Sequence, residues 1–112
     1  MHRALVSLGE ELEAIDWYGQ RIDATDDAEL REILRHNRNE EIEHAAMLLE
    51  WIRRRDPDME QRLKPRLFTS GSMVDVEDAL EGDNVAAAAD QNGNGAGKSA
   101  TVGSLRTARK GT

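Results

Sequence analysis

Apolar residues recur every three or four positions between residues 4 and 54, and the first proline of the chain is Pro57. This spacing is typical of amphipathic α-helices, in which one stripe of side chains faces a core. From Ala4 to Ile22 the stripe consists of Leu5, Leu8, Leu12, Ile15 and Ile22. We therefore expect a first long helix over this range.

Short polar residues from Asp23 to Asp27 interrupt the pattern and favour a turn. Thr25 or Asp26 is suited to cap a second helix, which we expect from about Ala28 to Arg54. Arginines at its end suit a helix C-terminus. A short loop between two long helices makes them antiparallel neighbours, so the sequence predicts an all-α hairpin.

The remainder of the chain shows weaker helical patterns. We expect a third, shorter helix at Asp58–Phe68, limited by Pro65, and another helical turn at Val74–Leu80. From residue 81 the composition shifts to Gly, Ala, Asn and Asp, which is typical of a flexible linker. The predicted organisation is a helical hairpin domain at 1–80, a flexible linker at 81–100 and a disordered tail at 101–112.

Composition excludes several classes of protein. Only 38% of the 112 residues are hydrophobic, so a monomer would be marginal and oligomerisation is expected. Cysteine is absent, which removes disulfides, thiolate metal sites and cysteine nucleophiles. The net charge of −7 argues against nucleic acid as the main partner. No apolar run is long enough for a membrane span or resembles a signal peptide, so we expect a cytoplasmic protein with no membrane partner.

Charged residues interrupt the inward stripe of the predicted second helix. That stripe can be followed as Leu30, Leu34, Asn37, Glu41, His44, Leu48 and Trp51. An unpaired buried carboxylate is costly, so Glu41 needs a reason to be there. Glu41 and His44 lie three residues apart, which puts both side chains on one face a single turn apart. A carboxylate and an imidazole in this arrangement form a half-site for a divalent metal.

The first helix supplies a matching carboxylate. Glu11 lies beside the apolar stripe, and Tyr18 lies two turns further along the same face. One Glu plus Glu-x-x-His is half of the ligand set of a di-iron four-helix bundle, and a two-fold homodimer would supply the other half. Alternatively, His44 is a hydrogen-bonded interface histidine and Glu41 a residue that sets helix register.

The other candidate residues carry weaker signals. His2 and His36 have no such constellation, so they are expected to be solvated. Glu10 and Glu13 are either a solvated surface or, in a dimer, an acidic entrance for cations. Trp17 and Trp51 are expected to be packing or interface aromatics.

The sequence resembles the encapsulated ferritins, iron oxidases packaged inside encapsulin shells. The matching residues are His2-Arg3-Ala4, Glu10-Glu11-Leu12-Glu13-Ala14, Asp16-Trp17-Tyr18, Gln20-Arg21, His36-Asn37-Arg38, Glu40-Glu41, Glu43-His44-Ala45-Ala46-Met47, Glu50-Trp51 and Leu67-Phe68-Thr69. The resemblance implies that residues 1–80 form a ferritin-like helical hairpin domain. Two such hairpins would form an obligate dimer, a ferritin-like four-helix bundle that completes a di-iron ferroxidase centre, and the dimers would assemble into a ring-shaped decamer. It implies iron ligands at Glu11, Glu41 and His44, with Tyr18 and Trp17 in the surrounding shell. Glu10 and Glu13 match an acidic site that attracts metal.

The tail resembles the targeting peptide by which cargo docks on an encapsulin shell. Its residues are Thr101, Val102, Gly103, Ser104, Leu105 and Arg106. Val102 and Leu105 can fill small apolar pockets, while Gly103 lets the backbone approach closely. The alternatives are a tail without function and a basic tail that touches RNA.

Together these patterns predict a ferroxidase that oxidises Fe(II) to Fe(III) inside an encapsulin nanocompartment in the cytoplasm, whose lumen stores the iron mineral. Two other functions fit the same residues. One is a helical interaction or scaffold protein with a structural metal site, such as zinc. The other is a related di-iron redox protein, such as a rubrerythrin-like peroxidase. The oxidant, dioxygen or peroxide, is left open by the sequence.

Overall fold

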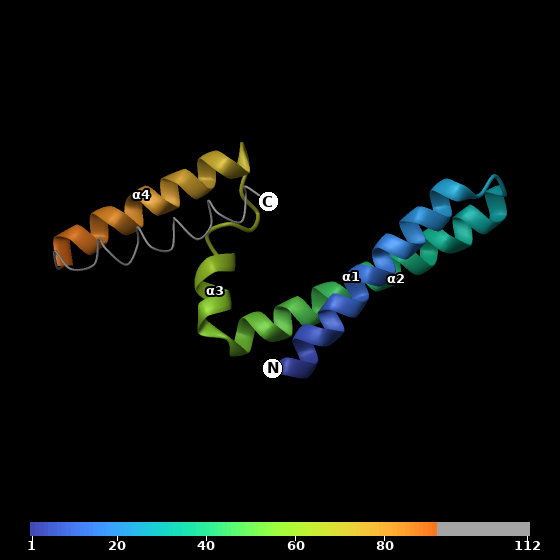
Figure 1. Cartoon of the computed structure of the whole chain (residues 1–112), viewed down its shortest axis with the longest axis horizontal. Coiled ribbons are helices and arrows are strands. Elements are labelled where there is room, and N and C mark those ends of the chain that lie inside the picture. Colours follow the sequence, from blue (N-terminus) through green and yellow to red (C-terminus); the bar gives the residue numbers. More distant parts are fainter. Residues whose placement is uncertain (92–112) are drawn as a thin grey trace, which may run out of the picture. The chain divides into compact units, whose positions relative to one another are not determined.

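The computed structural model describes the backbone of residues 1–91 and the side chains of residues 1–83. This part of the chain contains four helices and no strand, which confirms the all-α prediction (Figure 1). The helices are α1 (His2–Ala24), α2 (Ala28–Arg55), α3 (Pro57–Leu63) and α4 (Met73–Gln91). The chain divides into two compact units, Met1–Lys64 and Pro65–Thr112, and the candidate metal ligands all belong to the first unit.

The turn between α1 and α2 is held by side chains on both sides. The Asp27 carboxylate accepts a hydrogen bond from the Leu30 amide at 3.0 Å and so caps α2. The expected cap, Thr25 or Asp26, was wrong, because α2 begins at Ala28 and the capping residue directly precedes it. Thr25 instead accepts from the Asp27 amide at 3.2 Å. The Arg31 guanidinium donates to the carbonyl oxygens of Ile22, at 3.4 Å, and Thr25.

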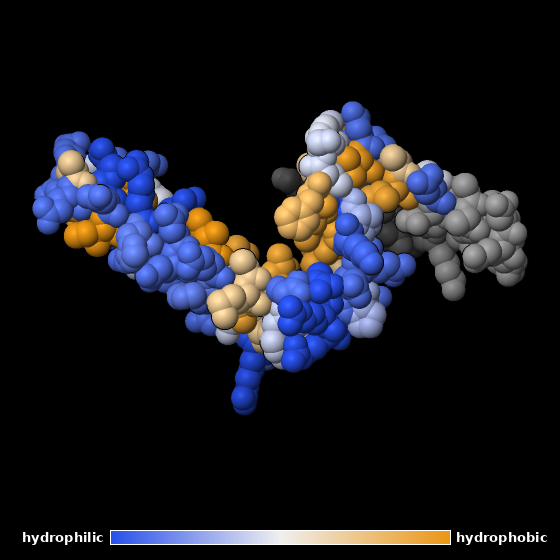
Figure 2. Space-filling view, turned by 180° about the vertical axis from the view of Figure 1, so that it is seen from behind, coloured by the Kyte–Doolittle hydropathy of each residue, from blue (hydrophilic) through white to orange (hydrophobic). Residues whose placement is uncertain are grey.

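Within the hairpin, α1 and α2 lie side by side and antiparallel, as predicted (Figure 1). Only Ala45 and Ile52 are buried among the residues whose side chains are described. Two apolar members of the predicted inward stripe are exposed, Leu30 at 44% and Trp51 at 38%. Figure 2 shows apolar side chains along the hairpin surface between hydrophilic ones. The single hairpin therefore leaves part of its apolar stripe uncovered.

The third helix is shorter than predicted. It ends at Leu63 rather than at Phe68. Lys64 still has helical backbone and donates to the Glu60 carbonyl, but Pro65 has no amide hydrogen with which to continue the hydrogen-bond ladder. Phe68 has a left-handed backbone with φ of 59°, which no α-helix continues.

The fourth helix is longer than predicted. It runs to Gln91, so residues 81–91 are helical instead of belonging to a flexible linker. Four consecutive alanines, residues 86–89, explain the difference, because alanine has the strongest intrinsic helix preference. The rest of the predicted linker and the whole tail lie outside the described residues. Among the described helices, none has the length and apolar character needed to cross a bilayer.

Candidate metal centre

Three metal-ligating side chains converge between the two long helices. Glu11 projects from α1, while Glu41 and His44 project from α2, one turn apart. The His44 Nδ1 atom lies 3.6 Å from Glu11 Oε2 and 3.5 Å from Glu41 Oε2. One ligand atom from each residue lies within 4.8 Å of the other two. The structure thus brings together the three residues that were predicted to bind metal.

The antiparallel hairpin explains this convergence. The Glu-x-x-His spacing aligns Glu41 and His44 on one face of α2. The short turn then sets the register that places Glu11 opposite them. The two carboxylate side chains are each 24% exposed, while the imidazole is 50% exposed. The cluster therefore lies at an open flank of the hairpin.

The electrostatics of the cluster favour a cation. The pKa of Glu11 is raised, chiefly by the hydrogen bond that its carboxyl shares with Glu41. Burial and repulsion from Glu41 raise the pKa further, while His44 lowers it. Two acidic groups this close cannot both ionise without cost, and a bound divalent cation would relieve the repulsion in place of a proton.

The donor set is suitable for a transition metal. Two carboxylates and one imidazole suit ferrous iron and zinc, and the carboxylates, as hard ligands, also suit ferric iron. Within residues 1–83, Glu11, Glu41 and His44 form the one group of three or more acidic or histidine side chains that lie close enough to share a metal ion. These three side chains leave coordination positions open on a single metal ion, and a pair of metal ions needs further protein ligands.

The aromatic residues of the predicted shell lie on α1 beyond the cluster. Tyr18 is half-buried, and the Arg21 guanidinium lies 5.9 Å from the centre of its ring. Trp17 is 51% exposed and lines a shallow hollow with Arg21. Among residues 1–83, no hydrogen bond joins either aromatic to the three ligands. Their predicted roles in the shell of the site therefore remain predictions.

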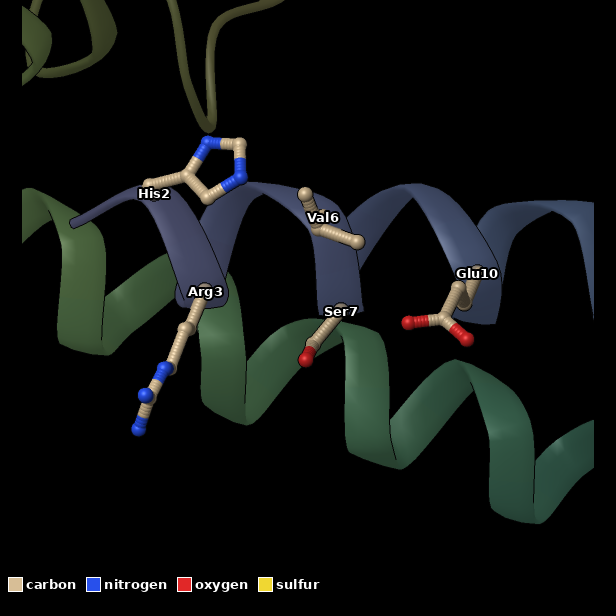
Figure 3. Close-up of a pocket in the computed structure, with 5 residues that line it drawn as sticks. All are labelled: His2, Arg3, Val6, Ser7 and Glu10. Carbon is tan, nitrogen blue, oxygen red and sulfur yellow. The ribbon is translucent and has the colours of Figure 1, made fainter.

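The two acids of the predicted entrance, Glu10 and Glu13, are both exposed on α1. Glu10 lines a second shallow hollow, together with His2, Arg3, Val6 and Ser7 (Figure 3). Figure 3 shows that all five side chains come from α1 and spread along its surface. The single chain does not bring Glu10 and Glu13 into the metal cluster, so the entrance also remains a prediction.

A second histidine has a partner that the sequence reasoning missed. His36 is exposed, as expected, but its Nε2 atom lies 2.9 Å from the Glu40 carboxylate. The two residues are four apart on α2, a spacing that brings helical side chains into contact. The four-residue spacing of His36 and Glu40 is the sequence signal from which this pair could have been predicted.

Comparison with known proteins places this chain in a family. The EncFtn-like family matches residues 1–70, which is more than half of the chain. This chain belongs to the EncFtn-like family. The crystal structure of protein ne0167 from Nitrosomonas europaea is 62% identical, with a TM-score of 0.63 over 64% of this chain and 79% of that one.

Two relatives match beyond the EncFtn-like region. The encapsulated ferritin-like protein of Rhodospirillum rubrum is 51% identical over 102 residues, which cover 91% of this chain. This chain spans 66% of the length of that protein. The encapsulin nanocompartment cargo protein EncC of Myxococcus xanthus is 38% identical over 107 residues, covering 90% of this chain and 80% of that protein.

Proposed function

We propose that this EncFtn-like chain is a ferroxidase that oxidises Fe(II) to Fe(III) at a di-iron site formed across a homodimer. The observation that carries the proposal is the convergence of Glu11, Glu41 and His44 within 4.8 Å, on the open flank of a two-helix hairpin. Iron is the substrate of the reaction. Each ferrous ion bound there gives up one electron to the oxidant, and the ferric product leaves for storage.

The ligand chemistry supports this reaction. The two carboxylates stabilise the ferric state because they are hard, charged donors, while the imidazole retains affinity for the ferrous ion. The pKa of Glu11 is raised, first by the hydrogen bond that its carboxyl shares with Glu41, so the two acids lie close enough for a divalent cation to take the place of the shared proton. The oxidation itself adds positive charge at the site, so the same carboxylates bind the product state better than the substrate state.

The second copy is required by ligand number. A hairpin contributes two Glu and one His, whereas a di-iron four-helix bundle uses twice that set. A two-fold axis beside the cluster repeats every ligand without further sequence. The exposure of Leu30, at 44%, and Trp51, at 38%, supports the dimer, because a second copy would cover apolar surface that the single chain leaves open. We further propose that such dimers assemble into a ring-shaped decamer.

We also propose that the protein works as cargo inside an encapsulin nanocompartment. The names of the Rhodospirillum and Myxococcus relatives support this destination. The match to the first of them covers 91% of the chain, so it extends past the predicted hairpin domain at 1–80. The targeting role of residues 101–106 rests on their sequence, since these residues lie outside the described range.

Ferrous-oxidation assays on matched variants test the ferroxidase. Glu11→Ala and His44→Ala each remove a ligand, and each should lower the rate at least about a hundredfold, the cost typical of an essential catalytic group. Glu32→Ala and His36→Ala remove the same residue types from exposed positions of α2 and should keep most of the activity. Equal rates in all variants, no faster than iron alone, would contradict the proposal.

A further inference from the structure

The joint between α2 and α3 consists of one residue. Asp56 has φ of −113° and ψ of 104°; α2 ends directly before it and α3 begins directly after it. Its amide donates to the Ile52 carbonyl at 2.9 Å, which completes the end of α2. Its carboxylate accepts from the amides of Asp58, at 3.0 Å, and Met59, at 3.3 Å, which caps α3.

This division of bonds makes Asp56 a natural pivot. The φ angle turns about the N–Cα bond, so the amide bonded to α2 stays on one side of the rotation. The carboxylate that caps α3 is attached to Cα and stays on the other side. The Asp56 carbonyl, which accepts from the Glu60 amide at 3.0 Å, also moves with α3. A change in φ therefore re-aims α3 as a rigid body without breaking either cap.

The short helix has little stability of its own. It contains seven residues, and none of its side chains is buried. A helix of this length is not stable alone in water, because nucleation is costly and few bonds follow. Contacts across the joint must therefore keep α3 in place.

One arginine spans the joint. Arg53 binds Glu50 on its own helix through two hydrogen bonds, of 2.6 Å from Nε and 2.7 Å from Nη2. Its third contact, from Nη1 to Glu60 at 2.7 Å, reaches α3. Glu50 thus orients the Arg53 guanidinium and leaves one of its hydrogen bonds to hold α3. The Arg53 side chain is 30% exposed and that of Glu60 45% exposed, so salt can screen the pair.

We propose that Asp56 is a hinge and that the Arg53–Glu60 ion pair is a latch that holds α3 on α2. When the latch opens, α3 first swings about Asp56 as a rigid body and then, without its contact to α2, unfolds, while the α1–α2 hairpin stays folded. The hinge and the latch lie where the α1–α2 hairpin, which carries the candidate metal ligands, joins the rest of the chain. It does not depend on the proposed ferroxidase activity.

Hydrogen exchange of the full-length protein, followed by mass spectrometry, tests the latch. Glu60→Gln keeps the shape of the side chain and removes its charge. Amides of residues 60–64 should exchange roughly two- to fivefold faster in this variant, while those of residues 30–50 stay unchanged. Arg54→Gln is the matched control, because Arg54 also binds Glu50 at 2.7 Å but stays within α2. It should leave exchange in α3 unchanged.

Salt provides a second measurement that needs no variant. Raising sodium chloride to about 1 M shortens the screening length to about 3 Å and should speed α3 exchange in the wild type, but not further in Glu60→Gln. Three results would overturn the latch: unchanged α3 exchange in Glu60→Gln, an equal rise in the hairpin, or an equal effect of Arg54→Gln. If Glu60→Gln fails to fold, a wild-type α3 whose exchange ignores salt overturns it.

Discussion

At the scale of single residues, Glu50 is a carboxylate whose charge is stabilised by two arginines. Hydrogen bonds from Arg53, and then from Arg54, lower its pKa from 4.5 to about 2. Arg53 in turn has its pKa raised, first by the bond to Glu50. These exposed groups contrast with Glu11, whose pKa is raised because its nearest partner is another acid. Arginines thus balance the carboxylate charge of Glu50 at the end of α2, whereas the nearest partner of Glu11 in the candidate site is another carboxyl group.

This contrast predicts a pH dependence of stability. Because the pKa of Glu50 is lower in the folded state, its ion pairs stabilise the fold fully above about pH 4.5 and lose that effect as the pH falls towards 2. Wild type should therefore have a higher thermal midpoint than Glu50→Gln at pH 6. The difference should shrink steadily between pH 4.5 and 2, as measured by circular dichroism at one protein concentration. A difference that is constant over this range would show that the charge of Glu50 does not stabilise the fold.

At the scale of elements, the turn between α1 and α2 matters because it sets the register of the hairpin. The register in turn places Glu11 opposite Glu41 and His44. Asp27 caps α2 through the Leu30 amide at 3.0 Å, and Arg31 ties the helix back to the end of α1. A helix start with an unpaired amide would be free to fray.

Replacing this cap should lower stability without touching the site. Asp27→Ala removes the carboxylate that satisfies the Leu30 amide and should reduce the free energy of unfolding by about 1 kcal/mol. Asp26→Ala loses the same charge one residue earlier, where no capping bond is made, and should cost clearly less. Urea unfolding at a fixed protein concentration measures both variants. Equal losses would assign the effect to charge near the helix dipole rather than to the cap.

At the scale of the whole molecule, the α1–α2 hairpin has almost no core, and its proposed metal site has half of the ligand set that a di-iron centre uses. Only Ala45 and Ile52 are buried within residues 1–83. Both features have one remedy, a second copy, because the same contact would cover apolar surface and double the ligands. The targeting role that we propose for residues 101–106 would then direct the assembly into an encapsulin shell.

Deleting residues 101–112 should abolish loading into the shell without changing the ferrous-oxidation activity. The truncated protein, co-expressed with an encapsulin shell protein, should remain outside the shell, while its ferrous-oxidation rate in solution stays near that of the full chain. Gel analysis of purified shells measures the loading. Loading at the wild-type level would show that these residues are not the docking signal.

The sequence by itself determined the two long helices and their pairing, because apolar spacing and a short polar turn act locally. It also placed Glu41 and His44 on one face, since three residues make nearly one helical turn. Local signals were less reliable where several competed. Thr25, Asp26 and Asp27 are all good caps, and only the position of the first helical residue chose Asp27. Alanines at residues 86–89 outweighed the nearby glycine and asparagine and extended α4.

The tertiary structure decided which distant residues meet. Glu11 lies within 3.6 Å of His44 because antiparallel packing brings together positions 33 residues apart in sequence, a register that periodicity alone does not set. The same packing decided that Leu30 and Trp51 stay exposed although their spacing pointed inward. It also revealed the contact from Arg53 to Glu60, since that bond depends on how α3 turns at Asp56. Local spacing defines the faces of helices, whereas their register and direction depend on the packing of the folded chain.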